Sequence, residues 1–320
     1  MTNILIKGLY RTGSHALVDL LSEYDNVGVL PFEFDHYRSP ANIADQLSAK
    51  SSRDWPNLIE ASLKNNSLKW QVFEKVVPDQ VVKMPLACNL LTRIPATSAA
   101  TKKRYYNITL KKLNQFLKSD ITFEEKIDRT KNWISEIGSI YARRKDYLVF
   151  DQPILPYTNI EVWPQVFDPF KLIFSIRNPK DQFADLVRSG RLFQPFGAPL
   201  QTWAGGLLEI IYGRDRAGAL AIFKDAVLRL YEDLSFIRRN IDPENLLIVQ
   251  FEKLVKDYNY QTAKIEDFIG GIDKHHASPK SQFNPERSIQ NIGICEKYLT
   301  DTEMKGLADV EAAFRESLRA

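Results

Sequence analysis

Residues 3–21 read NILIKGLYRTGSHALVDLL, and this stretch decides the fold. An apolar run at residues 3–6 ends at Gly8, a polar turn follows, and apolar residues then recur at helical spacing over residues 16–21. The predicted order is strand, tight loop and helix. Gly8 and Gly13 have the separation found in phosphate-binding P-loops, where glycines permit tight turns and the helix start offers N–H groups to an anion. The stretch therefore predicts a cradle for a phosphate-like group, with an ordinary glycine turn as the alternative.

The residues inside this loop do not fit a nucleotide triphosphatase. Ser14 and His15 stand where such enzymes carry the Lys and the Ser or Thr that hold the terminal phosphates and magnesium. Arg11 lies within the loop instead, and Thr12 and Ser14 supply hydroxyl groups. The pattern favours an anionic ligand that needs no magnesium.

The rest of the chain alternates apolar strands with helical patterns. Further strands are predicted at residues 27–30 (stopped by Pro31), 147–150, 171–176 and 246–251, with a helix at about 259–269. Such alternation predicts the α/β class, with a mostly parallel sheet flanked by helices. Together with the phosphate-binding turn at residues 8–13, it predicts a P-loop NTPase-like arrangement. No repeat or linker divides the sequence, so we expect one domain over residues 1–320, with a mainly helical insertion at about 40–145.

Composition excludes several classes of protein. Of the 320 residues 44% are hydrophobic and 26% are charged, as in a globular protein and not in a disordered one. The net charge of +3 is too small to indicate a nucleic-acid partner. With 2 cysteines and 4 histidines, neither a disulfide framework nor a metal site is expected. No apolar run is long enough for a signal segment or a membrane span, so we expect a cytoplasmic protein without a membrane partner.

A second anion-binding element follows the strand at residues 171–176. That strand leads directly into Arg177 and Asn178-Pro179, and a helical pattern comes next. In open α/β sheets, ligands bind at the carboxyl ends of the strands. A guanidinium group there can bind a phosphate through two parallel hydrogen bonds.

With these two elements the sequence resembles the PAPS-dependent sulfotransferases, closest in pattern to the carbohydrate and bacterial ones. Residues 8–21 resemble their 5′-phosphosulfate loop, and residues 173–185 (IFSIRNPKDQFAD) resemble their 3′-phosphate motif. Residues 246–269 resemble a later strand with an aromatic-Glu-x-Leu signature, and residues 283–293 resemble the C-terminal segment. The blocks follow the family's order. The resemblance implies a sulfotransferase fold, PAPS as the sulfuryl donor and no metal.

The resemblance also implies roles for individual residues. Arg11 would contact the 5′-phosphosulfate and stabilise the charge that develops on the sulfuryl group. Arg177 would hold the 3′-phosphate. The other residues expected to contact the donor are Thr12, Gly13, Ser14 and His15 in the loop, and Arg287 and Ser288 near the 3′ end of the nucleotide.

Three residues are candidates for the base that takes the proton from the acceptor. Glu33 ranks first, because heparan-type sulfotransferases carry a Glu followed by aromatics at this place, and desolvation between Phe32 and Phe34 would raise its pKa. His36 ranks second and His15 third. Asp35 is expected to orient the base or to lie at the surface.

The sequence departs from the family at two places. Asp185 stands eight residues after Arg177, where a Ser usually donates to the 3′-phosphate, and its charge would repel that group. Ser189, one helical turn later, can substitute, and Arg188 and Arg191 are cations that can compensate. The lysine expected in the strand before Arg177 is missing from residues 150–153, and Lys83 is the alternative.

Other conspicuous residues are given no role in the site. Trp55, Trp163 and Trp203 are expected in the core or at its boundary, and Glu252 is expected to cap or pair near the end of its strand.

These observations predict a sulfotransferase that transfers a sulfuryl group from PAPS to a hydroxyl or amine of a small-molecule or saccharide acceptor. The acceptor pocket is expected from the insertion and from residues 194–203. The alternatives are a P-loop kinase or nucleotide hydrolase, and a non-catalytic nucleotide-binding protein.

Overall fold

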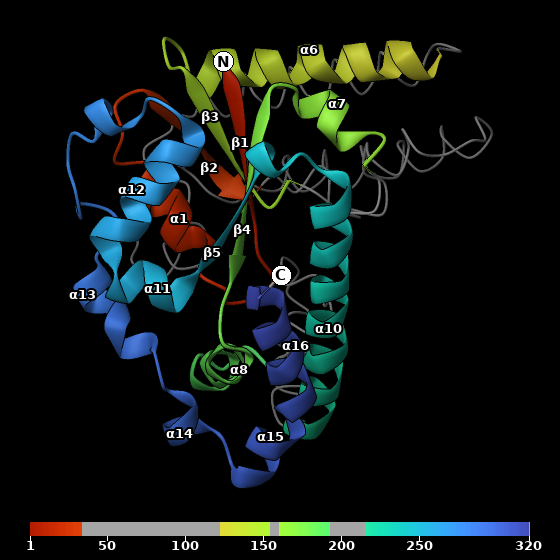
Figure 1. Cartoon of the computed structure of the whole chain (residues 1–320), viewed down its shortest axis with the longest axis vertical. Coiled ribbons are helices and arrows are strands. Elements are labelled where there is room, and N and C mark those ends of the chain that lie inside the picture. Colours follow the sequence, from red (N-terminus) through yellow and green to blue (C-terminus); the bar gives the residue numbers. More distant parts are fainter. Residues whose placement is uncertain (34–121, 154–159, 193–214, 320) are drawn as a thin grey trace, which may run out of the picture. The chain divides into compact units, whose positions relative to one another are not determined.

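The computed structural model describes residues 1–33, 122–153, 160–192 and 215–319. Within these residues five strands form a parallel sheet in the order β2-β3-β1-β4-β5, flanked by helices (Figure 1). The α/β class predicted from the sequence is confirmed. The strands are β1 (Thr2–Lys7), β2 (Val27–Glu33), β3 (Tyr147–Asp151), β4 (Phe170–Ile176) and β5 (Leu246–Gln250).

The helices of the described residues follow the strands in alternation and then continue alone to the C-terminal part of the chain. They are α1 (Ser14–Leu21), α6 (Phe123–Tyr141), α7 (Trp163–Phe167), α8 (Pro179–Arg188), α10 (Arg216–Asn240), α11 (Phe251–Lys256), α12 (Tyr258–Ile269), α13 (Pro285–Ser288), α14 (Cys295–Tyr298), α15 (Asp301–Gly306) and α16 (Ala308–Arg319).

The chain divides into two compact units. The first comprises residues 1–5 and 26–170, and the second comprises residues 6–25 and 171–320. The single domain expected over residues 1–320 stays a prediction.

In the first unit, β2 pairs in parallel with β3, and the long helix α6 contacts both β2 and α7. Helix α6 begins at a capping box, in which Thr122 Oγ1 accepts from the Glu125 N–H (3.2 Å) and Glu125 Oε2 accepts from the Thr122 N–H (3.0 Å). One face of α6 is buried through Trp133, Ile134 and Ile137. Packing of this apolar stripe holds the helix in place.

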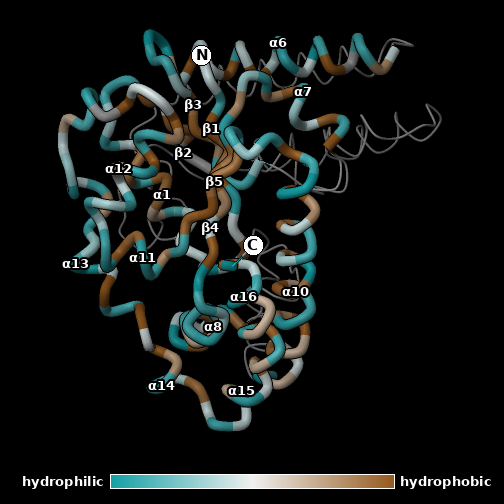
Figure 2. Tube along the Cα trace, viewed as in Figure 1, coloured by the Kyte–Doolittle hydropathy of each residue, from teal (hydrophilic) through white to brown (hydrophobic). Residues whose placement is uncertain are grey.

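In the second unit, β4 pairs in parallel with β5, and three helices pack together beside them. Helices α10 and α16 run side by side, and both contact α8 (Figure 1). Phe183 of α8 meets Phe223 of α10 with ring centroids 5.2 Å apart. Strand β4 is mostly hydrophobic (Figure 2), and its residues from Leu172 to Ile176 are all buried, as expected for a strand that is covered on both faces.

The end of α1 is fastened to residues 276–283 by one buried carboxylate. The Glu23 side chain is fully buried, and its Oε1 accepts from the N–H groups of Gln282 (2.8 Å) and Phe283 (2.9 Å). Its Oε2 accepts from the Lys280 N–H (3.0 Å) and lies 2.9 Å from His276 Nε2. A carboxylate removed from water requires such partners, so this contact is specific.

Two strand boundaries differ from the sequence prediction. Strand β2 does not stop at Pro31 but continues to Glu33. β2 is the first strand in the sheet order, and proline is tolerated at an edge because its missing N–H need not pair. Strand β5 ends at Gln250, and Phe251 already belongs to α11, because an apolar run alone does not distinguish a strand end from a helix start.

The other predicted elements in the described residues are confirmed. These are the strands at residues 3–6, 147–150 and 171–176, the helix over 16–21 and the helix at about 259–269. Most of the predicted insertion lies outside the described residues, as does residue Lys83. Its described end contains α6, which is helical as expected.

Candidate anion-binding site

The loop between β1 and α1 has no room for a side chain at Gly8 or at Gly13. Gly13 is the N-cap of α1 and has a φ of 91°, a left-handed conformation that favours glycine. A Cβ on Gly13 would also collide with the Phe251 ring, 3.0 Å from Cγ and closer still to Cδ2. A Cβ on Gly8 would overlap Thr12 Oγ1. Both predicted P-loop glycines therefore have a physical reason to be glycine.

Thr12 is buried inside the loop, with 3% of the residue exposed. Its carbonyl oxygen accepts a hydrogen bond from Ser175 Oγ of β4 (2.9 Å), which ties the loop to the strand. Its own Oγ1 is buried without a hydrogen-bond partner in the described part of the chain. A buried hydroxyl of this kind favours a ligand oxygen nearby, because an unpaired polar group in the interior is costly.

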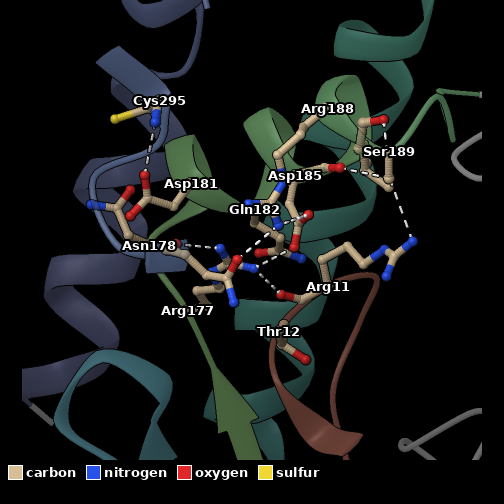
Figure 3. A network of polar contacts seen from close by, with 12 residues as sticks. Arg11, Thr12, Arg177, Asn178, Asp181, Gln182, Asp185, Arg188, Ser189 and Cys295 are labelled. Carbon is tan, nitrogen blue, oxygen red and sulfur yellow. Dashed lines mark hydrogen bonds and ion pairs between the residues drawn. The ribbon is translucent and has the colours of Figure 1, made fainter. Parts of the chain in front are cut away.

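Arg11 connects the loop to the end of α8 (Figure 3). Its Nη2 lies 3.4 Å from Ser189 Oγ and donates to it, while Ser189 Oγ donates to the Asp185 carbonyl oxygen (2.6 Å). Ser189 was predicted as a phosphate donor, but its hydroxyl proton is directed to the Asp185 carbonyl. The structure thus gives Ser189 a contact that orients the Arg11 side chain.

Arg177 lies directly after β4 and is buried, with 3% exposed. Its Nη1 donates to the Arg11 carbonyl oxygen (2.9 Å) and to Asp185 Oδ2 (3.0 Å). Its Nη2 donates to the Asn291 carbonyl oxygen (2.6 Å), and the guanidinium lies 5.0 Å from the Phe251 ring centroid. The arginine predicted to bind a phosphate is therefore engaged within the protein and supports the back of the loop.

Asp185 bridges two arginines. Its Oδ2 accepts from Arg177, and its Oδ1 accepts from Arg188 Nη2 (2.8 Å), one turn away on α8 (Figure 3). Burial raises the pKa of Asp185, but the charges and hydrogen bonds of Arg177 and Arg188 outweigh it and hold the pKa below its usual range. Asp185 is therefore ionised at neutral pH. Of the two cations expected to compensate, Arg188 does pair with it, and Arg191 is exposed.

The segment that follows α13 is fastened to α8 by side chains that the sequence reasoning missed. Arg188 Nη2 also donates to Asn291 Oδ1 (2.8 Å), and Asp181 accepts from the N–H groups of Gly293 (2.7 Å) and Cys295 (3.0 Å). Burial, followed by the Asp181 charge, raises the pKa of Cys295 to about 11. Asn291 and Gly293 lie within the C-terminal segment of the family resemblance, which was the available signal.

Arg287 and Ser288, predicted to close over a nucleotide, lie on α13. The backbone N–H groups of both donate to Asn284, whose Oδ1 and carbonyl oxygen accept (both 3.1 Å), so these contacts cap the short helix. The neighbouring Asn291, rather than these two residues, is what contacts Arg177 and Arg188.

Glu252 has the structural role expected for it. Its Oε1 accepts from the Asn178 N–H (2.8 Å), and the Asn178 side chain accepts from the Lys180 N–H (2.9 Å) at the start of α8. Burial raises the pKa of Glu252. The aromatic-Glu pair after β5 thus fixes the turn after β4, with Phe251 against Gly13 and Glu252 against Asn178.

The structure describes two of the three candidates for the base, Glu33 and His15. Glu33 is the last residue of β2 and pairs in register with Asp151 of β3. His15, on α1, has Nδ1 3.5 Å from Ser14 Oγ. His36 and Asp35 lie outside the described residues.

No group of three or more His, Cys, Asp or Glu residues in the described part of the chain could hold a metal ion. No helix in that part of the chain is long and apolar enough to cross a membrane.

Comparison with known proteins found no matching family model and no matching curated protein. Among solved structures, the sulfotransferase domain of the Synechococcus olefin synthase has a TM-score of 0.44 at 14% identity, covering 94% of each chain. A sulfotransferase from Mycobacterium avium has a TM-score of 0.43 at 13% identity, covering 99% of this chain and 76% of its own. The sulfotransferase domain from the curacin biosynthetic pathway has a TM-score of 0.42 at 13% identity, covering 97% and 96%.

Proposed function

We propose that this chain is a sulfotransferase that transfers a sulfuryl group from PAPS to a hydroxyl or amine of a small-molecule or saccharide acceptor. The observation that carries the proposal is the loop of residues 8–13. It supplies a helix N-terminus, the Arg11 guanidinium and the buried, unpaired Thr12 hydroxyl at one place. These are the groups that an oxyanion ligand requires.

Sulfuryl transfer is an in-line displacement at an anionic tetrahedral centre, so catalysis depends on positioning and on charge stabilisation. We assign to Arg11 the stabilisation of the negative charge on the transferred sulfuryl group. The Ser189 hydroxyl orients the Arg11 side chain. We assign the binding of sulfuryl and 5′-phosphate oxygens to Thr12 and to the N–H groups of Gly13, Ser14 and His15. Arg177 acts behind the loop, by holding the Arg11 carbonyl oxygen.

The base is proposed from the sequence. Glu33 is the first candidate, with His36 and His15 as alternatives. A base of this kind takes the acceptor proton as the bond to sulfur forms, and its pKa should appear in the dependence of kcat/KM on pH.

The test is calorimetric titration with adenosine 3′,5′-bisphosphate in the absence of magnesium, followed by assay of labelled sulfuryl transfer from PAPS to a panel of hydroxyl and amine acceptors. We expect micromolar binding that Arg11→Ala weakens by about tenfold or more, because a hydrogen bond to a charged group is lost. Arg216→Ala is the matched control, because this arginine pairs with Glu303 and the Tyr298 carbonyl oxygen instead.

The rival functions give different results in the same experiment. Binding of ATP with magnesium, and not of the bisphosphate, would replace the proposal with a kinase or hydrolase. Binding of the bisphosphate without transfer to any acceptor would favour a non-catalytic nucleotide-binding protein.

A further inference from the structure

The carboxylate of Asp185 occupies a position between two arginines that could otherwise bind an oxyanion. Its two oxygens lie 3.0 Å from Arg177 Nη1 and 2.8 Å from Arg188 Nη2. Guanidinium groups bind carboxylate and phosphate oxygens with the same planar hydrogen-bond geometry. The protein therefore places its own anion where two cations converge.

This arrangement engages both terminal nitrogens of the inner arginine, Arg177, while its Nε is buried without a hydrogen-bond partner among the described residues. The Arg177 side chain is 3% exposed, and both of its terminal nitrogens donate to protein oxygens. The side chains of Asp185 and Arg188 are 13% and 31% exposed, so the group opens toward solvent on the Arg188 side. A ligand anion arriving there meets Arg188 together with the ionised Asp185, and the like charge opposes it.

The same group is in contact with the anion-binding loop. Ser189 Oγ accepts from Arg11 and donates to the Asp185 carbonyl oxygen, and Arg177 donates to the Arg11 carbonyl oxygen. A nucleotide whose phosphate end lies at the loop would therefore have a second phosphate, if it carries one, within reach of this group.

We propose that Asp185 determines the specificity of the nucleotide site by occupying the Arg177–Arg188 pair in place of a second ligand phosphate. The proposal rests on the proposed function, because it presupposes a nucleotide bound at the loop. A phosphate on the ribose then adds little affinity. Adenosine 5′-phosphosulfate, which lacks that phosphate, is therefore a donor comparable to PAPS.

The experiment compares two nucleotides, AMP and adenosine 3′,5′-bisphosphate, by calorimetric titration at low ionic strength. For the wild-type chain we expect dissociation constants within about threefold of each other, since Arg177 and Arg188 are both already paired with Asp185. For Asp185→Ser we expect tighter binding of the bisphosphate by about tenfold or more, with AMP unchanged, because Arg177 and Arg188 are released to the ligand.

Asp181→Asn is the matched control. Asp181 lies one turn earlier on the same helix and is also buried. Within the described residues it accepts from the backbone N–H groups of Gly293 and Cys295 and is hydrogen-bonded to the Cys295 thiol, and it pairs with no arginine. Its removal releases no arginine, so the ratio of the two dissociation constants should stay as in the wild type. A ratio that changes equally in both variants would overturn the proposal, because it would reflect a general loosening of α8.

Asp185→Asn protects the test against a folding failure, because it removes the charge and retains the shape; circular dichroism checks both variants. The ratio of the dissociation constants of AMP and adenosine 3′,5′-bisphosphate for the wild-type chain is itself a test that does not depend on the folding of any variant. A wild-type preference for the bisphosphate of about tenfold or more would refute the role of Asp185 and leave the proposed function standing. Absence of binding by either nucleotide to the wild type would refute both.

Discussion

Replacing Gly13 by Ala tests whether the loop is shaped by its contact with the Phe251 ring. Gly13 has a φ of 91°, and an added Cβ would lie 3.0 Å from Phe251 Cγ. Gly270 is the matched control, because its φ is 82° and nothing lies within 4 Å of the added Cβ. Both variants carry the backbone cost of a left-handed alanine, but only Gly13→Ala carries the collision.

The left-handed conformation costs an alanine about 1–2 kcal/mol. Forcing an extra carbon into a packed site costs a further ~1–3 kcal/mol, so we expect Gly13→Ala to lower the free energy of unfolding by roughly 2–5 kcal/mol. Gly270→Ala should lower it by about 1–2 kcal/mol only. Phe251 is 5% exposed and lies under the Arg177 guanidinium, so the ring has little room to move aside.

Urea unfolding followed by circular dichroism measures the difference. With a slope of about 3 kcal/mol per molar urea, the two midpoints should differ by roughly 0.3–1 M. Gly13→Ala combined with Phe251→Leu should recover part of the loss, since the smaller side chain removes the ring edge. Equal destabilisation by Gly13→Ala and Gly270→Ala, or no recovery in the double variant, would refute this account of the loop.

Three further variants test the buried carboxylates. Because the pKa of Asp185 is lowered, its ionised form stabilises the fold above the ordinary carboxyl pKa, and this stabilisation is lost as the pH falls through the lowered pKa. Asp185→Asn should therefore cost about 2–4 kcal/mol of unfolding free energy at pH 7 and progressively less as the pH falls below the ordinary carboxyl pKa. The raised pKa of Glu252 has the opposite effect, because the free energy of unfolding falls as the pH rises from the ordinary carboxyl pKa through the raised one. Glu252→Gln should reduce this fall in stability, and an unchanged dependence of the urea midpoint on pH would contradict the prediction. Asp181→Asn removes a charge that raises the pKa of Cys295, so in a Cys88→Ser background the thiol should react several-fold faster with a disulfide reagent at pH 8; an unchanged rate contradicts this.

The fold and the loop could be predicted because local signals determine them. The apolar run before Gly8, the helical spacing after Gly13 and the arginine at the end of β4 are all visible within short windows of sequence. The two wrong strand boundaries, at Pro31 and Phe251, lie where tertiary context decides: the position of β2 in the sheet, and the start of a helix within an apolar run.

The use of Arg177 could not be predicted in the same way. The sequence shows Asp185 eight residues later, where its charge is expected to repel a phosphate. The structure gives it two arginine partners, and both of them also contact Asn291, which lies 114 and 103 residues further along the chain. Whether an arginine is available to a ligand depends on such distant partners, which no spacing rule within one segment contains.

The fastening of α1 by Glu23 has a consequence for the order of events during synthesis. The loop leaves the ribosome long before the residues that satisfy Glu23, because the N–H groups that the carboxylate accepts from belong to residues 280, 282 and 283. Until those residues emerge, Glu23 would have to stay hydrated, and α1 cannot take its buried place. Contacts of such long range are slow to form. We therefore expect nascent chains that end before residue 276 to expose the loop to proteases, and full-length chains to protect it.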